Sequence, residues 1–206
     1  MRPWKCKRRG KVTSRCVLIG VVGTGSGVGV THLALSIANF FSSALGARCA
    51  YAELCAESKV MSYLPDDTVI AGSNVGYRYK GVDYYPAVSR DSLSFIRNNL
   101  YDIVICDLGK ASYEDWIVTN RCDRLMIIGS MQPWRFDEYR RFMRDFYITN
   151  GTLNGGLYGL YLKKNEKFRF EKEFGVSVDG IPFISDPYGL NKTDIEYLQK
   201  LTAGWL

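Results

Sequence analysis

Residues 23–32 read GTGSGVGVTH, and this glycine-rich stretch decides how the whole chain is interpreted. It follows an apolar run at residues 16–22, CVLIGVV, which is typical of a strand buried on both faces of a parallel sheet. After it, residues 31–45 carry apolar side chains at helical spacing, and Gly46 is placed to end that helix. Because the first amides of a helix and its dipole favour negative charge, this strand–loop–helix unit predicts an anion site.

The spacing within the stretch matches a phosphate-binding loop, G-x-x-x-x-G-K-[ST], except that the lysine is missing. In the register set by Gly29, Thr31 fills the hydroxyl position and Val30 fills the lysine position. The glycines allow the backbone to turn and to approach a ligand closely. An alternative is a glycine-rich turn without a ligand. The residues expected to bind a nucleotide are Gly25, Ser26, Gly27, Val28, Gly29, Val30, Thr31 and His32.

Length and composition indicate one domain in a reducing compartment. The chain has 206 residues and no run of 18 apolar residues, so no membrane span is expected. Its six cysteines form no C-x-x-C pair, and most lie in apolar runs, which favours a cytoplasmic protein and argues against a zinc site. The basic start continues into the expected core, so we do not interpret it as a cleaved signal peptide.

Charge is concentrated at one end of the chain. Residues 1–15 contain seven Lys or Arg and no acid, whereas the whole chain carries +6, so residues 16–206 sum to −1. We therefore predict a flexible basic arm at 1–15 and a single domain at 16–206. Such an arm can contact anionic membrane or nucleic acid, with Trp4 as an interfacial anchor, or it can remain solvated without a partner.

Strand and helix patterns alternate along the chain, which predicts a three-layer, doubly wound, mostly parallel α/β sheet with helices on both faces. Residues 65–88 are irregular and are expected to form an edge excursion or a small hairpin. The apolar side of residues 194–206 is expected to dock onto the domain rather than bind membrane, because its polar side is not strongly basic. Strands are expected at 16–22, 48–54, 103–107, 124–129, 157–162 and 176–184, and helices at 31–45, 89–99, 135–148, 166–174 and 191–201.

Asp107 is the candidate metal ligand. It ends an apolar strand, which is where a carboxylate holds Mg²⁺ directly or through water in phosphate-binding folds. Thr31 is the matching hydroxyl ligand. The alternatives are a structural Asp107 that caps the next turn and a Thr31 that caps the following helix.

The glycine loop, the strand ending YAEL, the YDIVICDLG segment and the late VDGIPFISDP segment together resemble the ParA/MinD superfamily of deviant Walker A ATPases. The resemblance covers most of residues 16–200, in order. Within the superfamily, the THLALSIANF and RCDRLMIIGS stretches look most like the TadZ/CpaE-like branch of pilus-assembly localisation proteins. This resemblance implies a P-loop NTPase fold, ATP or ADP with Mg²⁺, and a homodimer facing across nucleotide.

The departures from the family pattern concern charge. The signature lysine that reaches the partner's nucleotide falls on Gly25, and the P-loop lysine falls on Val30. The acid that orients the attacking water would be the second Asp of D-x-D, but this chain has Glu53 and then Cys55, which leaves Glu53 as a weak catalytic candidate. The purine-reading Asn is replaced by Lys163 or a neighbour.

Other residues of this chain are candidates to replace the missing charges. Lys59, Arg78 and Lys110 lie in neighbouring loops, and the sequence does not select among them. Trp134 and Arg135 follow a central strand, where they either meet the site or pack at the surface, and the second interpretation is slightly favoured. His32 either contacts a phosphate or partner, or is a packed or capping side chain on the first helical turn, which is the favoured interpretation.

The missing charges are expected to affect the rate of hydrolysis more strongly than the affinity for nucleotide. A charge-assisted hydrogen bond contributes about 1.5–3 kcal/mol, so loss of the lysine weakens binding roughly ten- to a hundredfold. A cation acting from a partner contributes roughly 10³–10⁵ in rate in related phosphoryl transfers. We therefore expect weak or vestigial nucleotide binding without efficient hydrolysis.

Three functions follow from these expectations. The first is a degenerate ParA/MinD-like localisation or scaffold factor of a cytoplasmic assembly of the pilus or secretion type, which would be cytoplasmic or peripheral at the inner face of the membrane. The second is a DNA- or membrane-binding module that acts through the basic arm. The third, ranked last, is an active ATPase that uses replacement cations or a partner.

Overall fold

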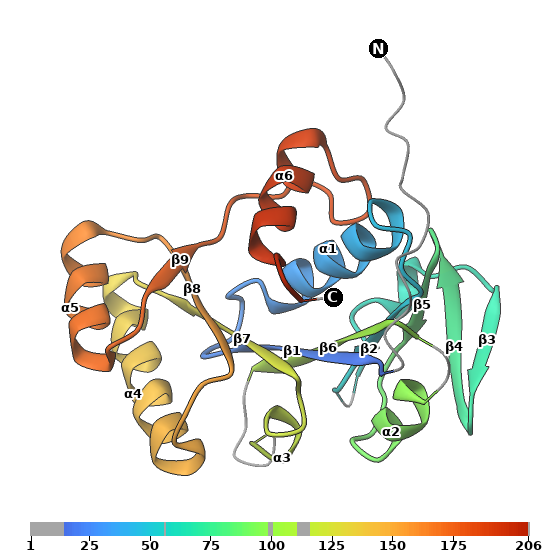
Figure 1. The fold of residues 1–206 in the computed structure, drawn as a ribbon, viewed down its shortest axis with the longest axis horizontal. Helices are drawn as coiled ribbons and strands as arrows, with labels where there is room; N and C mark the ends of the chain where they lie inside the picture. The colour runs from blue at the N-terminus through green and yellow to red at the C-terminus, as the bar shows by residue number, and fades with distance from the viewer. Residues whose placement is uncertain (1–14, 56, 99–100, 111–115, 206) are drawn as a thin grey trace.

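The computed structural model describes residues 15–55, 57–98, 101–110 and 116–205, so most of the predicted arm, residues 1–14, lies outside the described part. Its strands form one sheet in the order β3-β4-β5-β2-β6-β1-β7-β8-β9 (Figure 1). The bounds are β1 Val17–Gly23, β2 Cys49–Glu53, β3 Thr68–Ala71, β4 Asn74–Tyr79, β5 Val82–Tyr85, β6 Ile103–Lys110, β7 Arg124–Ser130, β8 Gly155–Leu160 and β9 Val178–Gly180.

The sheet is parallel from β5 through β9, and only β3 and β4 run antiparallel to their neighbours. The irregular stretch 65–88 therefore contains the expected hairpin at the sheet edge, which is followed by a parallel strand, β5. In a parallel sheet all strands end at one edge. We call this the carboxyl edge, and we call the opposite one the amino edge.

Helices cover both faces of this sheet, which confirms the predicted three-layer α/β fold. In Figure 1, α1 and α6 lie on one side of the sheet, whereas α2, α3, α4 and α5 lie on the other. The bounds are α1 Val30–Ser43, η1 Met61–Tyr63 (a 3₁₀ helix), α2 Ser92–Arg97, α3 Trp116–Thr119, α4 Pro133–Asn150, α5 Lys164–Phe174 and α6 Lys192–Leu201.

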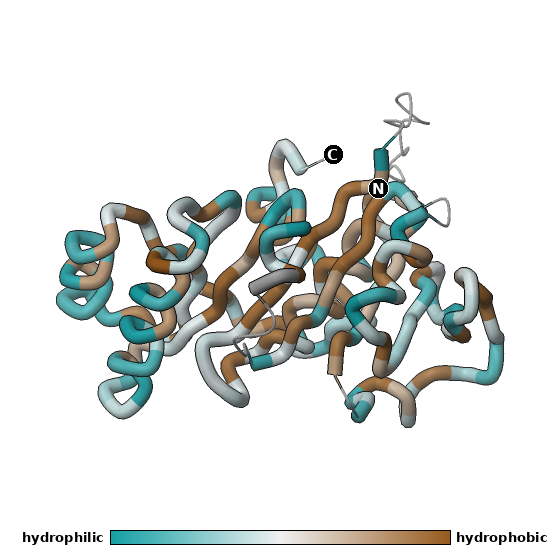
Figure 2. Tube along the Cα trace, turned by 90° about the horizontal axis from the view of Figure 1, so that it is seen from below, coloured by the Kyte–Doolittle hydropathy of each residue, from teal (hydrophilic) through white to brown (hydrophobic). Residues whose placement is uncertain are grey.

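The core follows the alternation of side chains along each strand. In β1, Ile19 and Val21 are fully buried against the α1 side, while Leu18 and Val22 belong to the cluster on the other side. Apolar residues therefore mark the central strands in Figure 2, and the outer helices show polar segments. A continuous apolar run such as residues 16–22 is required because both faces of the strand are covered.

Two predictions about the last third of the chain have different outcomes. Residues 194–206 were expected to dock onto the domain, and α6 does so: Leu198 is fully buried with the α1 cluster, and an Asn191–Asp194 capping box begins the helix. The strand expected at 176–184 was too long. Only Val178–Gly180 pairs with β8, because the chain soon reaches Pro182, which has no backbone N–H to donate.

No helix in the described part of the chain combines the length and the apolar character that crossing a membrane requires.

Candidate functional site

The glycine loop connects β1 to α1 at the carboxyl edge, with the backbone conformation that the sequence predicted. Gly27 and Gly29 have φ of 70° and 85°, in the region that favours glycine. Gly29 is the N-cap of α1, and no side chain caps this helix start. The first amides of α1 have no intrahelical acceptor, and the N-cap glycine supplies none from a side chain, which is the arrangement that attracts an anion.

Two valines fill the space behind the loop. A Cβ placed on Gly23 would lie 2.7 Å from a methyl carbon of Val30 and 2.8 Å from one of Val28. Val28 is 1% exposed and Val30 is 7% exposed, and both join the apolar cluster on the α1 side. At the position of the phosphate-binding lysine, this chain thus buries an apolar side chain that stabilises the loop without adding charge.

Thr31 and His32 occupy the first turn of α1. Thr31 is half-buried, and since Gly29 is the N-cap, the alternative interpretation of Thr31 as the helix cap is wrong. His32 is exposed and its Nε2 donates to the carbonyl oxygen of Ile184 at 2.6 Å. This bond joins the start of α1 to the segment that leads into α6, in agreement with the structural interpretation of His32.

Asp107 lies near the end of β6, on the face that α1 covers. It is 2% exposed; the Tyr51 hydroxyl donates to Oδ2 at 2.8 Å and the Gly109 amide donates to Oδ1 at 2.9 Å. Burial, and then the charges of Asp107 and Glu53, raise the pKa of Tyr51 well above its ordinary value, so the phenol keeps its proton and remains a donor. Both oxygens of Asp107 therefore have partners, although a carboxylate has further lone pairs for a metal.

Glu53 ends β2 directly beside Asp107 in the strand register. It is 1% exposed, and its two oxygens accept from the Ser58 hydroxyl at 2.5 Å and the Lys59 amide at 2.9 Å. The carboxylate thus holds the turn that follows β2. This arrangement accounts for the acid structurally and gives no support to a role in orienting water.

The described residues contain no group of three or more His, Cys, Asp or Glu side chains suited to a metal ion. Thr31 and Asp107 would supply two oxygen ligands at most. Mg²⁺ is commonly held by one or two carboxylates plus substrate phosphates. The residues present therefore fit Mg²⁺ as a partner of bound phosphate, and the donor set does not form a dedicated cage.

The first turns of α4 also contact the glycine loop. The Arg135 guanidinium donates to the carbonyl oxygen of Ser26. The Glu138 carboxylate lies against Gly25, where a Cβ would collide with it, and the Lys110 ammonium is 4.0 Å from its other oxygen. Of Trp134 and Arg135, Trp134 is 75% exposed, whereas Arg135 meets the loop, so the slightly favoured surface interpretation of Arg135 is wrong.

The structure separates the remaining candidates for replacement charge. Lys110 lies at the loop, as described above. Arg78 instead forms a two-pronged ion pair with Asp83 at 2.7 and 2.9 Å, at the amino edge. Lys59 and Lys163 are exposed, and Lys163 is the N-cap residue of α5, just after β8.

Glu138 and Tyr51 were not among the residues expected at the site. The contact of Glu138 with Gly25 arises because β7, which leads into α4, pairs with β1, and the Thr24 amide donates to Ile128 of β7 at 2.9 Å. No local spacing signals this contact. Tyr51 lies on the same face as Glu53, two residues before it, which was the one available signal.

Comparison with known proteins identifies the class of fold. No family model and no curated protein matches the chain. Solved structures do: a plasmid partition protein from Borrelia burgdorferi B31 bound to AMPPNP has a TM-score of 0.67 and 16% identity, covering 91% of this chain and 97% of that one. The sheet and the glycine loop thus belong to the P-loop NTPase-like α/β fold seen in ParA/MinD-type ATPases.

Two further structures support the same fold. A ParA family ATPase from Chlorobium tepidum TLS has a TM-score of 0.64 and 14% identity, covering 92% of each chain. MinD of Aquifex aeolicus, in the MinC:MinD cell division complex, has a TM-score of 0.58 and 13% identity, covering 90% of this chain and 86% of that one. At these identities the shared property is the fold.

Proposed function

We propose that this chain is a degenerate member of the ParA/MinD superfamily, close to the TadZ/CpaE-like branch. It acts as a localisation or scaffold factor of a cytoplasmic assembly, of the pilus or secretion type. It binds ATP or ADP weakly and does not hydrolyse ATP efficiently. Homodimers and proteins of the assembly machinery are its expected partners, and it is cytoplasmic or peripheral at the inner face of the membrane.

The observation that carries this proposal is the buried valine at position 30. The loop keeps its left-handed glycines and the uncapped start of α1, yet the lysine position holds a side chain that packs onto Gly23. Glu53, the nearest equivalent of the water-orienting acid, is engaged by Ser58 and Lys59. The anion-binding backbone is retained while the groups that would accelerate hydrolysis are replaced or occupied.

Weak binding follows from the groups that remain. Backbone amides of the loop, the Thr31 hydroxyl and an Mg²⁺ ion near Asp107 would hold a di- or triphosphate at roughly micromolar to millimolar Kd. A protein of this kind uses nucleotide to bias its conformation or its assembly rather than to drive turnover.

Isothermal titration with ADP and ATP, with and without Mg²⁺, tests the proposal. Val30→Lys restores the missing charge and is expected to tighten binding about tenfold to a hundredfold. Val30→Met, which adds length without charge, is the matched control and should leave affinity near that of the unmodified chain. ATP hydrolysis well above background by the purified chain, abolished by Asp107→Ala, would contradict the proposal.

The charge distribution favours a second candidate function. Seven basic residues and no acid lie within residues 1–15, which suits a contact with DNA or anionic lipid. The solved structures of this fold include pNOB8 ParA bound to nonspecific DNA, at 14% identity and a TM-score of 0.57, covering 91% of this chain and 93% of that one. Retention on DNA and on acidic vesicles should fall when residues 1–14 are deleted, and unchanged retention rules this function out.

A further inference from the structure

Three charged side chains gather at the mouth of the glycine loop, from elements far apart in the sequence. Arg135 and Glu138 come from the first turns of α4, and Lys110 is the last residue of β6. They reach the loop because β7 and β6 flank β1 on either side. Together they place a guanidinium, an ammonium and a carboxylate beside backbone groups that favour anions.

Their geometry differs from that of an ordinary surface ion pair. Glu138 and Lys110 are 40% and 57% exposed and approach only to 4.0 Å, which is too weak an interaction to serve stability. The Glu138 carboxylate lies directly against Gly25, the position at which the family resemblance places a lysine. A negative charge therefore lies at the edge of a loop that is shaped to receive one.

Arg135 contacts the loop without pairing its charge with a carboxylate there. It donates to the neutral carbonyl oxygen of Ser26 rather than to a carboxylate. A guanidinium has five N–H donors in a planar fork, which suits phosphate oxygens. One bond to Ser26 holds the side chain at the loop, and this bond uses only one of the guanidinium's N–H donors.

We propose that Glu138 is a displaceable internal counter-ion of the glycine loop, and that Arg135 and Lys110 contact the phosphates once Glu138 leaves. This inference rests on the proposed function, since it concerns the same site. The ligand class is a di- or triphosphate group. The loop thus has its cations supplied by α4 and β6, with a carboxylate that opposes binding until it is displaced.

The test is calorimetric titration of the full chain with inorganic pyrophosphate. Glu138→Gln removes the charge and keeps the volume, and it should tighten binding about tenfold, because a like charge within a few ångströms of the ligand is removed. Glu138→Ala should tighten it at least as much. Asp137→Asn is the matched control: Asp137 precedes Glu138 on α4 but is 81% exposed and pairs with Arg140, so affinity should not change.

Arg135→Gln is expected to weaken pyrophosphate binding about tenfold, whereas Arg141→Gln, an exposed arginine on the same helix, should have no effect. Thermal melts of each variant exclude unfolding as the cause. Unchanged affinity in Glu138→Gln, or no detectable binding by that variant, overturns the inference. Failure of the proposed function is distinguishable, because it shows as brisk ATP hydrolysis whatever Glu138→Gln does to affinity.

Discussion

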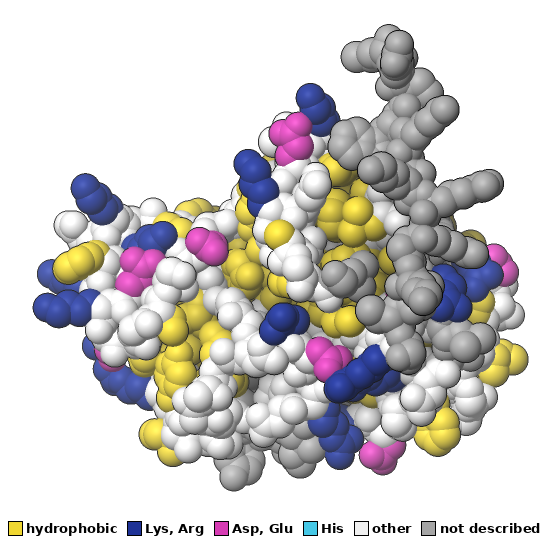
Figure 3. Space-filling view, in the orientation of Figure 1, with side chains coloured by type: hydrophobic (Ala, Val, Ile, Leu, Met, Phe, Trp, Pro, Cys, Tyr) yellow, Lys and Arg dark blue, Asp and Glu magenta, His cyan; other side chains and the backbone are white. Residues whose placement is uncertain are grey.

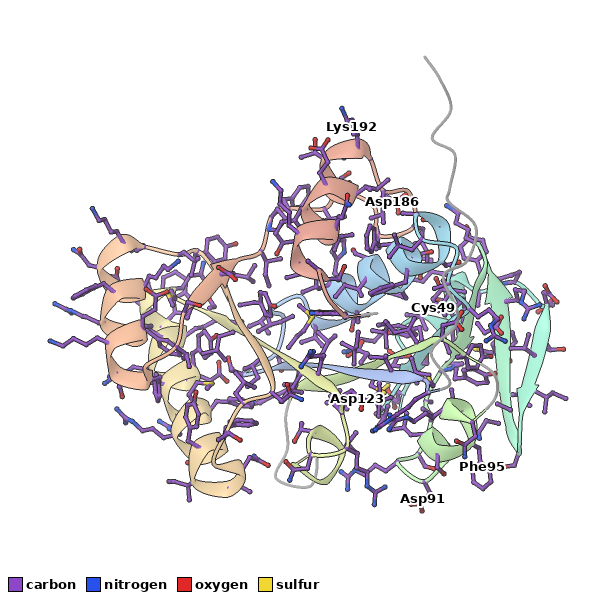
Figure 4. All side chains as sticks on the ribbon, viewed as in Figure 1. Cys49, Asp91, Phe95, Asp123, Asp186 and Lys192 are labelled. Atoms are coloured by element: carbon purple, nitrogen blue, oxygen red, sulfur yellow. The ribbon has the colours of Figure 1, made fainter. Side chains whose placement is uncertain are left out.

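The two edges of the sheet use charge in opposite ways. At the amino edge, charged groups are saturated by one another. Asp123, labelled in Figure 4, accepts from the Leu18 amide at 2.8 Å and from Arg97 and Arg15 at 2.5 and 3.0 Å. These bonds fasten the start of β1 to the loop before β7. Arg15, the last residue of the predicted arm at 1–15, is therefore held at the amino edge, at the opposite end of β1 from the glycine loop.

A second amino-edge cluster follows the same pattern. Asp83 is 6% exposed; it takes both prongs of Arg78 and also accepts from the Tyr101 hydroxyl at 2.7 Å. Arg48 pairs with Asp102 at 2.9 Å and donates its backbone amide to the same carboxylate. These residues line or adjoin a cavity of about 770 Å³ whose charges already have partners.

At the carboxyl edge, Glu53 and Asp107 accept from neutral donors, whereas the described charged side chains around the glycine loop are not closed into ion pairs. Arg135 meets a neutral carbonyl, and Glu138 and Lys110 stay 4.0 Å apart. Figure 3 shows one face of the whole molecule, on which Lys and Arg side chains and Asp and Glu side chains lie scattered between apolar patches. Among the described residues, this face carries no single large patch of one charge. Closed ion pairs therefore mark where this fold is fastened, and loosely paired charges mark where a ligand is expected.

The largest effect that would test this contrast is expected at Asp83. Asp83→Ala leaves the Tyr101 hydroxyl and Arg78 without their acceptor, so the free energy of unfolding should fall by about 2–3 kcal/mol, while pyrophosphate affinity stays the same. Urea denaturation followed by circular dichroism gives the first quantity and calorimetry the second. Asp83→Asn keeps one acceptor oxygen and should lose less. A loss below about 1 kcal/mol for the alanine variant contradicts the fastening role.

Tyr51→Phe probes a closed contact at the carboxyl edge. It removes the donor to Asp107 and leaves a buried carboxylate oxygen short of a partner, so stability should fall by about 1–2 kcal/mol. Tyr77→Phe serves as a control, since Tyr77 lies in β4, away from Asp107. Equal denaturation midpoints for Tyr51→Phe and the unmodified chain would mean that the Tyr51 bond does not hold Asp107.

Arg135→Gln and Glu138→Gln test the contrast at the carboxyl edge. If these side chains serve ligand binding, each substitution should change the free energy of unfolding by less than about 0.5 kcal/mol. The same urea titration checks this expectation. A stability loss comparable to that of Asp83→Ala would mean that the charges at both edges stabilise the fold, and it would contradict the distinction between the two edges.

The smallest effect concerns thiols at the two edges. Burial is the main cause that raises the pKa of Cys16, at the amino edge, and of Cys55, after β2, from 9.0 to about 11 in each case. A raised pKa means that the folded state holds the proton more tightly, so this contribution to stability is complete below pH 9 and is lost as pH rises towards 11. Cys16→Ser and Cys55→Ser should each flatten the stability–pH curve slightly over that interval, measured by denaturation at pH 8 to 11. Unaltered curves for both variants would show that neither thiol is shielded.

Local patterns in the chain carried most of the fold. The uninterrupted apolar run before residue 23, the glycine spacing, and the alternation of strand and helix signals suffice for a parallel three-layer sheet, because burial on both faces demands apolar runs and left-handed turns demand glycine. Val30 in place of lysine could be identified from the glycine spacing, whereas the strand expected to end at Asp107 continues to Lys110. Boundaries were less accurate, as the shortened last strand shows.

Pairings across the sheet required the folded chain. Three contacts depend on which strands lie side by side: Glu138 with Gly25, Tyr51 with Asp107, and Arg97 with Asp123. The neighbours of β1 are β6 and β7, although some 80 and 100 residues separate them from β1 along the chain. Spacing along a chain encodes turns and faces, since these are set by the backbone of a few residues. Contacts between distant segments depend on the packing of the entire core, which no short pattern contains.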